Sequence, residues 1–334
     1  MERKYIVGVD IGGTWIRVAI CTSDLKEQNI KSKSTKTLKE NMHSISNSVY
    51  QLLSELLLEN NVKKKQVIGI GLATAGPIDM KKGEVFNNAN LGFKTIPLKE
   101  PIQEKFPGIP IHLINDCRAA ALGVHYFEAE DSEKDNIVYI TVSTGIGGGV
   151  ICNGHLLLGK EGNAAEIGHG LVDPKSNIKC NCGACGCWEV YSSGTGVRTR
   201  ALNYLSEGKM NSNILTHIVN GDISKITAKE VFQAAREGDE LAIKVVNDCV
   251  FYSKVGVGLV NNFYDPVAIY FGGAMTRDKE QLINPLVEQF ESNAILFTIN
   301  HPPKIKLTKL GDAIGIKGAL VLAKYKLEHN PIVP

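Results

Sequence analysis

A cluster of cysteines is the sharpest chemical signal in this sequence of 334 residues. Four of its eight cysteines, Cys180, Cys182, Cys185 and Cys187, lie within eight positions. Thiolates at such spacing bind Zn²⁺, which takes four sulfur or nitrogen ligands in a tetrahedron. The alternative is a set of buried free thiols, which the intervening glycines disfavour because they make a poor core strand. Since four protein ligands leave no position for water, we expect a structural zinc.

Polar side chains on either side of the cysteines suit a different task. Glu166 and His169 precede them and Glu189 follows them. Carboxylates and imidazoles can accept and donate hydrogen bonds to the hydroxyls of a polyol. We therefore expect the zinc loop to position these three groups around a ligand.

Two glycine turns suggest that phosphate is bound. Asp10 is followed by Gly12-Gly13-Thr14, and a second strand leads into Thr144-Gly-Ile-Gly-Gly-Gly149. Backbone amides in glycine turns form concave anion sites, and a carboxylate such as Asp10 could hold Mg²⁺ through water. One such turn would be ordinary hairpin chemistry, but two of them, with Gly272-Gly273 after a third strand, favour a nucleotide. The sequence contains no G-x-x-x-x-G-K-[ST] phosphate loop.

The dipeptide Asn115-Asp116 stands between a short strand and a helix-forming run. An aspartate in this place could accept the proton of an attacking hydroxyl. Both residue types are also common helix N-caps, and taken alone the dipeptide favours that structural role.

The elements that would position these residues alternate along the chain. Strands are expected at Tyr5–Asp10, Val67–Leu72, Ile111–Ile114, Ile137–Val142 and Val267–Phe271, with helices between and after them. Alternating strands and helices predict the α/β class. Polar residues cluster where strands end, which is where open α/β sheets bind ligands, so we expect two similar halves that share a cleft.

Composition narrows the class of protein further. Thirty-seven basic and thirty-five acidic residues give a formal charge of +2, which does not suggest a nucleic-acid or membrane-surface protein. No apolar run approaches the length needed to cross a bilayer, and the sequence starts without an apolar signal region. We expect a cytoplasmic protein with no membrane or nucleic-acid partner.

Taken together, these motifs resemble the sugar kinases of the ROK (repressor, open reading frame, kinase) family, which have the actin-like ATPase (ribonuclease H-like) fold. The resemblance spans nearly the whole chain. Its most specific part is Glu166-x-Gly-His169 followed by Cys180-x-Cys182-Gly-x-x-Gly-Cys187-x-Glu189. The two glycine turns are similar to the phosphate loops of that family, and Asn115-Asp116 with the following Ala119-Ala120-Ala121-Leu122-Gly123 is similar to its catalytic segment.

The resemblance implies a role for each matching residue. Asp116 would be the general base that deprotonates the 6-hydroxyl of a sugar. The ring hydroxyls would be bound by Asn90, Asn115, Glu166, His169 and Glu189. ATP and Mg²⁺ would contact Asp10, Gly12, Gly13, Thr14, Thr144, Gly145 and Gly147, with Gly272, Gly273 and Gly315 against the adenosine. Zn²⁺ would be held by His169, Cys180, Cys182 and Cys187, with Cys185 as a competing thiol.

The same resemblance predicts the organisation of the molecule. We expect a small domain of residues 1–117, completed by a C-terminal helix at about 312–334, and a large domain of residues 118–311 with the zinc loop. The partners would be a sugar and ATP, and the assembly a homodimer or a tetramer. Glucose is the favoured sugar, with N-acetylmannosamine or N-acetylglucosamine as the alternative. A sugar-sensing repressor of the same family is disfavoured, because the first strand starts near Tyr5 and leaves no room ahead of it for a helix-turn-helix domain.

Overall fold

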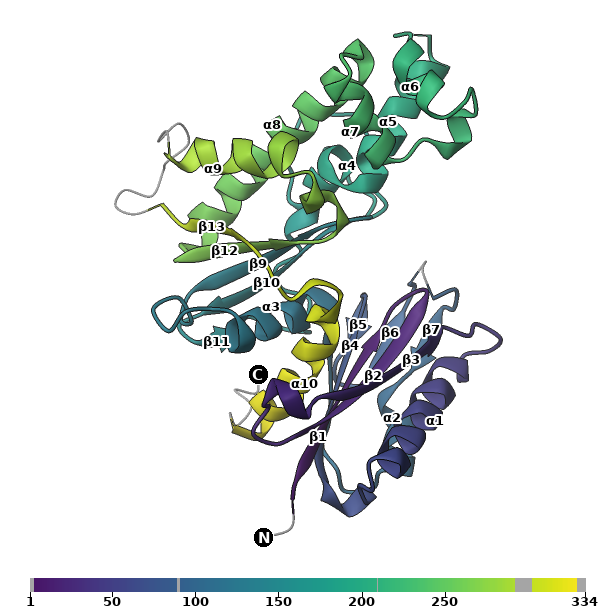
Figure 1. The fold of residues 1–334 in the computed structure, drawn as a ribbon, viewed down its shortest axis with the longest axis vertical. Helices are drawn as coiled ribbons and strands as arrows, with labels where there is room; N and C mark the ends of the chain where they lie inside the picture. The colour runs from purple at the N-terminus through teal and green to yellow at the C-terminus, as the bar shows by residue number, and fades with distance from the viewer. Residues whose placement is uncertain (1–2, 89–90, 209, 292–301, 329–334) are drawn as a thin grey trace. The chain divides into compact units, whose positions relative to one another are not determined.

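The computed structural model describes residues 3–88, 91–208, 210–291 and 302–328 and shows a mixed α/β architecture, as the sequence predicts (Figure 1). The chain forms two compact units. The first runs to Lys134 and adds His155–Ala164 and the stretch from Lys309 onward. The second contains Asp135–Gly154 and Ala165–Thr308.

A five-stranded sheet in the order β3-β2-β1-β4-β8 forms the centre of the first unit. Strands β1, β4 and β8 are parallel, whereas β2 is antiparallel to both β1 and β3. A small antiparallel sheet, β5-β6-β7, follows β4 in the chain. The strands are β1 (Tyr5–Ile11), β2 (Trp15–Thr22), β3 (Lys31–Lys36), β4 (Val67–Thr74), β5 (Ile78–Asp79), β6 (Glu84–Phe86), β7 (Thr95–Pro97), β8 (Ile111–Asn115) and the short β11 (His155–Leu156). The helices are α1 (Ser44–Glu59), α2 (Lys99–Lys105), α3 (Asp116–Phe127) and α10 (Ile314–Glu328), with single turns at Glu27–Asn29, Lys64–Gln66 and Gly311–Ala313.

Helices cover the two faces of this sheet because side chains alternate along each strand. Val7 and Val9 of β1 join the apolar cluster that includes Val49 and Leu53 of α1. Gly8 lies between those two valines and points the other way, so closely against α10 that a Cβ there would lie 2.7 Å from the backbone nitrogen of Leu320. Helices α1 and α10 therefore pack on opposite faces.

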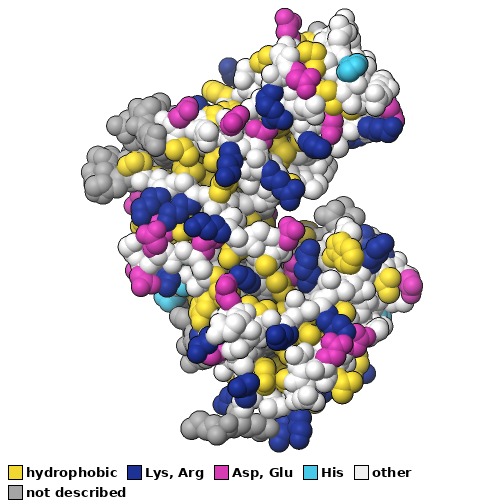
Figure 2. All heavy atoms as spheres, viewed as in Figure 1, with side chains coloured by type: hydrophobic (Ala, Val, Ile, Leu, Met, Phe, Trp, Pro, Cys, Tyr) yellow, Lys and Arg dark blue, Asp and Glu magenta, His cyan; other side chains and the backbone are white. Residues whose placement is uncertain are grey.

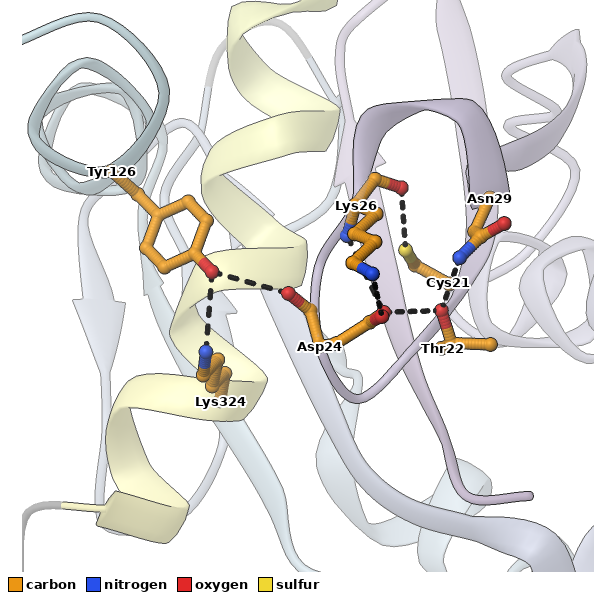
Figure 3. A network of polar contacts seen from close by, with 7 residues as sticks. All are labelled: Cys21, Thr22, Asp24, Lys26, Asn29, Tyr126 and Lys324. Atoms are coloured by element: carbon orange, nitrogen blue, oxygen red, sulfur yellow. Dashed lines mark hydrogen bonds and ion pairs between the residues drawn. The ribbon is translucent and has the colours of Figure 1, made fainter.

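A polar network ties the ends of three elements of this unit together (Figure 3). The Lys324 ammonium of α10 donates to the Tyr126 hydroxyl near the end of α3, at 3.2 Å. That hydroxyl in turn donates to the Asp24 carbonyl at 3.3 Å, and the Asp24 carboxylate accepts from the Thr22 hydroxyl. The network fixes α3 and α10 to the turn that follows β2.

The second unit repeats the theme of a sheet with helices. Its sheet has five strands in the order β11-β10-β9-β12-β13, with the short β11 at the edge and β12 parallel to both β9 and β13. Besides β11, these are β9 (Ile137–Val142), β10 (Ile146–Cys152), β12 (Ala268–Gly272) and β13 (Lys304–Leu307). The helices are α4 (Trp188–Ser192), α5 (Gly194–Ser206), α6 (Asn213–Ile218), α7 (Ala228–Arg236), α8 (Glu240–Tyr264) and α9 (Asn284–Glu291). Short helical segments lie at Ile167–His169, Ile223–Lys225, Ala274–Arg277 and Lys279–Ile283.

The division into compact units differs from the domain boundary expected at residue 117. Helix α3 and residues up to Lys134 belong to the first unit, and so do His155–Ala164. The reason is the packing of α3 on α10, where a Cβ on Gly318 would lie 1.9 Å from the Ala119 carbonyl oxygen. This contact between residues almost 200 positions apart keeps α3 with the sheet that precedes it.

The surface agrees with the balanced composition. On the face drawn in Figure 2, Lys and Arg side chains are interspersed with Asp and Glu. Among the described residues, helices that are both long and apolar enough to span a membrane are absent.

The contact between α3 and α10 yields a stability prediction. Replacing Gly318 with alanine should lower the free energy of unfolding by about 2 kcal/mol, because the added methyl must push the two helices apart. Gly221→Ala is the matched control, since nothing lies within 4 Å of the new Cβ and only its positive φ of 79° opposes the change. This control should lose about 1 kcal/mol. Urea unfolding measures both, and equal losses would contradict the packing argument.

Candidate active site and metal centre

The carboxyl ends of parallel strands bring the first group of predicted site residues to one edge of the first sheet. In the register, Ile11 of β1 pairs with Thr74 of β4, which pairs with Asn115 of β8. Asp10 precedes Ile11, and Asp116 follows Asn115 as the first residue of α3. The two aspartates lie close enough for the charge of Asp116 to affect the ionisation of Asp10.

Opposing effects of burial and of neighbouring charges act on the pKa of Asp10. Burial raises its pKa to about 6 from 3.8, and the nearby Asp116 carboxylate adds to the rise. The Arg17 guanidinium opposes it by donating to Oδ2 of Asp10 at 3.1 Å. The start of α10 also approaches, because a Cβ on Gly315 would lie 2.7 Å from the Asp10 carboxyl. A carboxylate is favourable at a helix N-terminus, so Gly315 allows this interaction.

Of the two roles that the sequence left open for Asn115 and Asp116, the structure shows the helix N-cap at Asn115. The Asn115 side chain is 9% exposed and accepts a hydrogen bond from the backbone N–H of Cys117 at 2.9 Å, so it is the N-cap of α3. Oδ1 of Asp116 accepts from the same N–H, also at 2.9 Å. Nδ2 of Asn115 faces the backbone at Gly76, where a Cβ would lie 3.6 Å away. The helix start thus holds both side chains at the sheet edge.

The first glycine turn joins β1 to β2 at the same edge. Its backbone is closed by a hydrogen bond from the Gly12 N–H to the Trp15 carbonyl, at 2.9 Å. Thr37 supports the turn from outside: its hydroxyl donates to the Gly12 carbonyl at 2.7 Å and its N–H to the Thr14 carbonyl at 2.9 Å. Gly13 and Thr14 form the tip.

The second turn lies in the second unit and is shorter than the sequence suggested. Strand β10 already begins at Ile146, which pairs with Val142, so the turn contains only Ser143, Thr144 and Gly145. Gly147 is therefore part of the strand and pairs with Thr141. The start of α5 anchors the turn, because the N–H groups of Gly194 and Thr195 donate to the carbonyls of Ser143 and Thr144.

Glu189 connects this turn to the cysteine loop. Its Oε2 accepts a hydrogen bond from the Ile146 N–H at 2.9 Å. The same oxygen lies 2.5 Å from the position of a Cβ on Gly145, so any larger residue there would displace the Glu189 carboxylate. Glu189 stands in α4, directly after Trp188, which is buried against Gly256 of α8. The Glu189 carboxylate is thus held by the Ile146 N–H, and the backbone of Glu189 is anchored by the buried Trp188.

The cysteine loop forms a group with the geometry of a metal centre. The ligand atoms of His169, Cys180, Cys182 and Cys187 all lie within 4.8 Å of one another. Nδ1 of His169 is 3.5 Å from the Cys180 sulfur, and the sulfurs of Cys182 and Cys187 are 3.6 Å apart. Zn–S bonds of about 2.3 Å in a tetrahedron separate two sulfurs by about 3.8 Å, so the group fits Zn²⁺. Cys185 lies outside it.

Backbone contacts preform this loop. The N–H of Cys180 donates to the Ala184 carbonyl at 2.8 Å, and that of Gly183 to the Cys180 carbonyl at 3.0 Å. Gly186 has a φ of 77° and lies so near the Asp173 carbonyl that a Cβ on Gly186 would be 2.0 Å from its oxygen. The loop therefore has its ligand geometry from the chain itself.

A cavity of about 660 Å³ opens beside the second turn, entirely within the second unit. Ser143 and Thr144 line one part of it, and α5 and α7 both begin at its wall, with Gly194 and Lys229 among the lining residues. Helix N-termini attract anions. The remaining wall mixes apolar and basic side chains with one carboxylate: Arg198, Phe232, Arg236, Met275, Arg277 and Asp278.

Gly273 lies next to the second turn without lining the cavity. Its φ is 96°, and a Cβ would lie 2.4 Å from the Val142 carbonyl oxygen, immediately before the turn. Gly272, the last residue of β12, brings the chain to this point.

The predicted residues therefore fall into two groups. Asp10, Gly12, Gly13, Thr14, Asn115, Asp116 and Gly315 belong to the first unit, and Thr144, Gly145, Gly147, Glu166, His169, Glu189, Gly272, Gly273 and the cysteines belong to the second. Asn90 lies outside the described residues. The side chains of α5 and α7 that line the cavity were missed. Their one signal in the sequence was the capping box of Thr227 and Glu230, which marks the start of α7.

Comparison with known proteins agrees with the architecture. The model of the ROK family matches residues 6–326. A glucokinase of Halalkalibacterium halodurans is 33% identical over 98% of this chain and 97% of its own length. A ROK hexokinase structure from Thermus thermophilus has a TM-score of 0.78 at 25% identity, covering 97% of this chain and 99% of that one. A ROK family glucokinase of Streptomyces griseus, solved with glucose and AMPPNP, has a TM-score of 0.73 at 28% identity, covering 96% and 99%.

These similarities extend over almost the full length of each protein, and they confirm the expected actin-like ATPase fold. The chain belongs to the ROK family.

Proposed function

We propose that the protein is an ATP-dependent hexose kinase that transfers the γ-phosphoryl group of ATP to the 6-hydroxyl of glucose. The observation that carries the proposal is the placement of Asp116 beside Asp10 and the first glycine turn, at one edge of a parallel sheet. Full-length similarity to proteins named glucokinase supports glucose as the acceptor.

Asp116 is the general base in this proposal. Its carboxylate accepts the proton of the 6-hydroxyl as that oxygen forms a bond to the γ-phosphorus and the bond to the bridging oxygen of ADP breaks. Asn115 orients the acceptor from the adjacent position. The other ring hydroxyls are assigned to Asn90, Glu166, His169 and Glu189. With Nδ1 of His169 directed at Cys180, Nε2 is the nitrogen assigned to the sugar.

The glycine turns and the cavity serve the nucleotide. The phosphate contacts are assigned to Gly12, Gly13, Thr14, Thr144, Gly145 and Gly147, and the adenosine contacts to Gly272, Gly273 and Gly315. The cavity of about 660 Å³ has room for an adenosine, and its two helix N-termini and basic side chains suit the attached phosphates. The Asp10 carboxylate has the oxygen donors that Mg²⁺ prefers. Mg²⁺ bound there would supply positive charge to the phosphoryl oxygens.

We assign a structural zinc ion to His169, Cys180, Cys182 and Cys187. Its donor set, sulfur and imidazole, suits Zn²⁺ better than Mg²⁺. All four positions of a tetrahedron are then taken by the protein, so the ion would hold the loop and leave no place for a reacting water.

The acceptor sugar is the point where the proposal has a rival. N-acetylmannosamine and N-acetylglucosamine present similar hydroxyls to the same residues and differ from glucose at the 2-position. A coupled assay of ADP release over the three sugars decides between them, and turnover with N-acetylmannosamine but not glucose would overturn our first choice. A cytoplasmic location and assembly as a homodimer or a tetramer stay predictions.

Replacing Asp116 with asparagine should lower kcat for glucose by about 100- to 10,000-fold, because the variant cannot accept the proton of the 6-hydroxyl. Glucose affinity should change little, since an amide still hydrogen-bonds the hydroxyl. The ADP-release assay measures kcat, and calorimetric titration measures affinity. Asp131→Asn, at an exposed carboxylate of the same unit, is the control and should keep full activity. Normal turnover in Asp116→Asn would rule out the base.

The metal centre is tested by two substitutions in one loop. Cys182→Ser should lower the zinc content from about one ion per chain and reduce Tm by several degrees, because a ligand of the loop is lost. Cys185→Ser should retain both zinc and Tm, since this thiol lies outside the ligand group. Elemental analysis and thermal unfolding give the two readouts. Wild-type protein purified without chelator that contains no zinc would refute the site.

Asp10 should make stability depend on pH in an unusual direction. Its folded pKa of about 6 exceeds the unfolded value near 3.8, so the folded state binds its proton more tightly. The resulting stability is present below pH 4 and is lost as pH rises through 6. In the absence of nucleotide and Mg²⁺, Asp10→Asn should therefore gain up to about 3 kcal/mol relative to the wild type between pH 4 and pH 7.5.

Asp24→Asn provides a control of opposite sign. The Thr22 hydroxyl lowers the pKa of the exposed Asp24 carboxyl, so the wild type should gain on this variant as pH rises. Urea unfolding at several pH values measures both differences. Parallel pH profiles for Asp10→Asn and the wild type would show that the carboxyl of Asp10 ionises normally.

A further inference from the structure

Ten residues of the chain, His155–Ala164, form a strap that belongs to the first unit although Gly154 before it and Ala165 after it belong to the second. The Leu156 N–H donates to the hydroxyl of Tyr325 at 3.3 Å, and the Ala164 N–H closes the strap on the Leu158 carbonyl at 3.1 Å. Gly162 packs on the Met80 side chain so tightly that a Cβ would lie 2.0 Å from its sulfur.

A buried arginine holds the end of the strap. Arg118 of α3 is 1% exposed, and Nη2 of its guanidinium donates to the carbonyl of Ala164. Burying a guanidinium is costly, and an apolar side chain of similar volume would fill the same space without that cost. The property that distinguishes arginine here is its charge-assisted hydrogen bond to the strap.

The contacts of the strap lead back to the residues that we assign to the acceptor sugar. Nδ2 of Asn163 reaches the Ile78 carbonyl at 3.5 Å. Two residues earlier, the backbone at Gly76 passes near Asn115, because a Cβ placed on Gly76 would lie 3.6 Å from Nδ2 of that side chain. Arg118 links the strap to Asn115 through the helix itself, because it follows Asn115 by three residues at the start of α3.

Asn88 holds the backbone at Ala75 and Gly76, next to Asn115. Its side chain is 5% exposed and donates to the carbonyls of Ala75 and Gly76, at 3.0 and 2.6 Å. The segment against Asn115 is therefore held on one side by Asn88 and on the other by Ile78 and the strap. The strap, in turn, is held by Arg118.

Backbone strain occurs directly beyond the anchored residue. Ala165 has a φ of 61°, which is unfavourable for a residue with a Cβ. Such strain persists where neighbouring contacts determine the path of the chain, and it concentrates at functional sites. Glu166, one of the residues assigned to the sugar, follows immediately.

We propose that Arg118 is a positioning residue for the acceptor sugar: by holding the Ala164 carbonyl it fixes the strap, and through Asn163 and Ile78 it fixes the backbone that packs on Asn115. The proposal rests on the hexose kinase function, but Arg118 does not itself touch the sugar. Loss of the anchor should therefore impair the use of sugar and spare the binding of ATP, because the strap contains none of the residues that we assign to ATP and the cavity proposed for the adenosine is lined by residues of the second unit.

The test replaces Arg118 with methionine, which has similar length and no donor. We expect kcat/KM for glucose to fall about 10- to 100-fold, mainly through KM for glucose, with KM for ATP within about twofold of the wild type. Arg118→Lys keeps a cationic donor and should recover most of the loss. Gly162→Ala disturbs the strap without changing Arg118, and it should raise KM for glucose in the same way.

Arg200→Met is the matched structural control. Arg200 is also buried, at 5% exposure, and pairs with Asp248 in the second unit. Its loss should lower Tm while leaving KM for glucose unchanged. If Arg118→Met only lowers Tm, or raises KM for ATP as much as KM for glucose, the positioning role is wrong.

Failure of the kinase proposal is a separate outcome. Glucose binding can be read without catalysis, from the rise in Tm that glucose causes in each variant. If the wild type phosphorylates none of the three sugars, the proposed function fails. If it does turn over glucose but Arg118→Met keeps the wild-type KM and the wild-type rise in Tm, only the present inference fails.

Discussion

The parallel pairing of β1, β4 and β8 is the constraint on which the first half of the site depends. Parallel strands end at the same edge of a sheet, and the row Ile11, Thr74 and Asn115 sets that edge. Backbone hydrogen bonds thereby force Asp10 and Asp116 together, although their charges repel. Burial raises the pKa of Asp10, the Asp116 charge adds to the rise, and Arg17 opposes it without abolishing it. Two carboxylates held in this way form a natural place for a cation.

In the second unit, the Glu189 side chain links the cysteine loop to the second glycine turn. Glu189 comes two residues after the zinc-loop residue Cys187, and its carboxylate is hydrogen-bonded to the backbone that follows the second glycine turn. A shift of the loop would therefore move a group assigned to the sugar and the turn assigned to phosphate. This explains how a metal ion without an open position can matter for catalysis. In our proposal the ion would act as a brace, and the chemistry would remain with the side chains that it holds.

Local signals in the sequence predicted the parts of the molecule that depend on neighbouring residues. The two glycine turns and the cysteine loop are features of that kind. The compact units do not divide at residue 117, because α3 packs against Gly318, far away in the chain, and a single sequence carries no sign of that contact. The cavity wall was missed for a related reason. Helices α5 and α7 line the cavity because their first turns meet there, and an amphipathic pattern does not predict the position of a helix end in space.

The two buried arginines show how environment separates a structural role from a positioning role. Arg200 is paired with Asp248, and its guanidinium also lies 5.2 Å from the centre of the Tyr191 ring, so its charge is balanced by contacts within the second unit. Arg118 is buried more completely and directs its donor at a backbone carbonyl at the end of the strap. The carbonyl that Arg118 holds has a notable place in the chain: Ala164 stands one residue before a strained alanine and two before Glu166, so in our proposal freedom at that point would pass directly to a group assigned to the sugar.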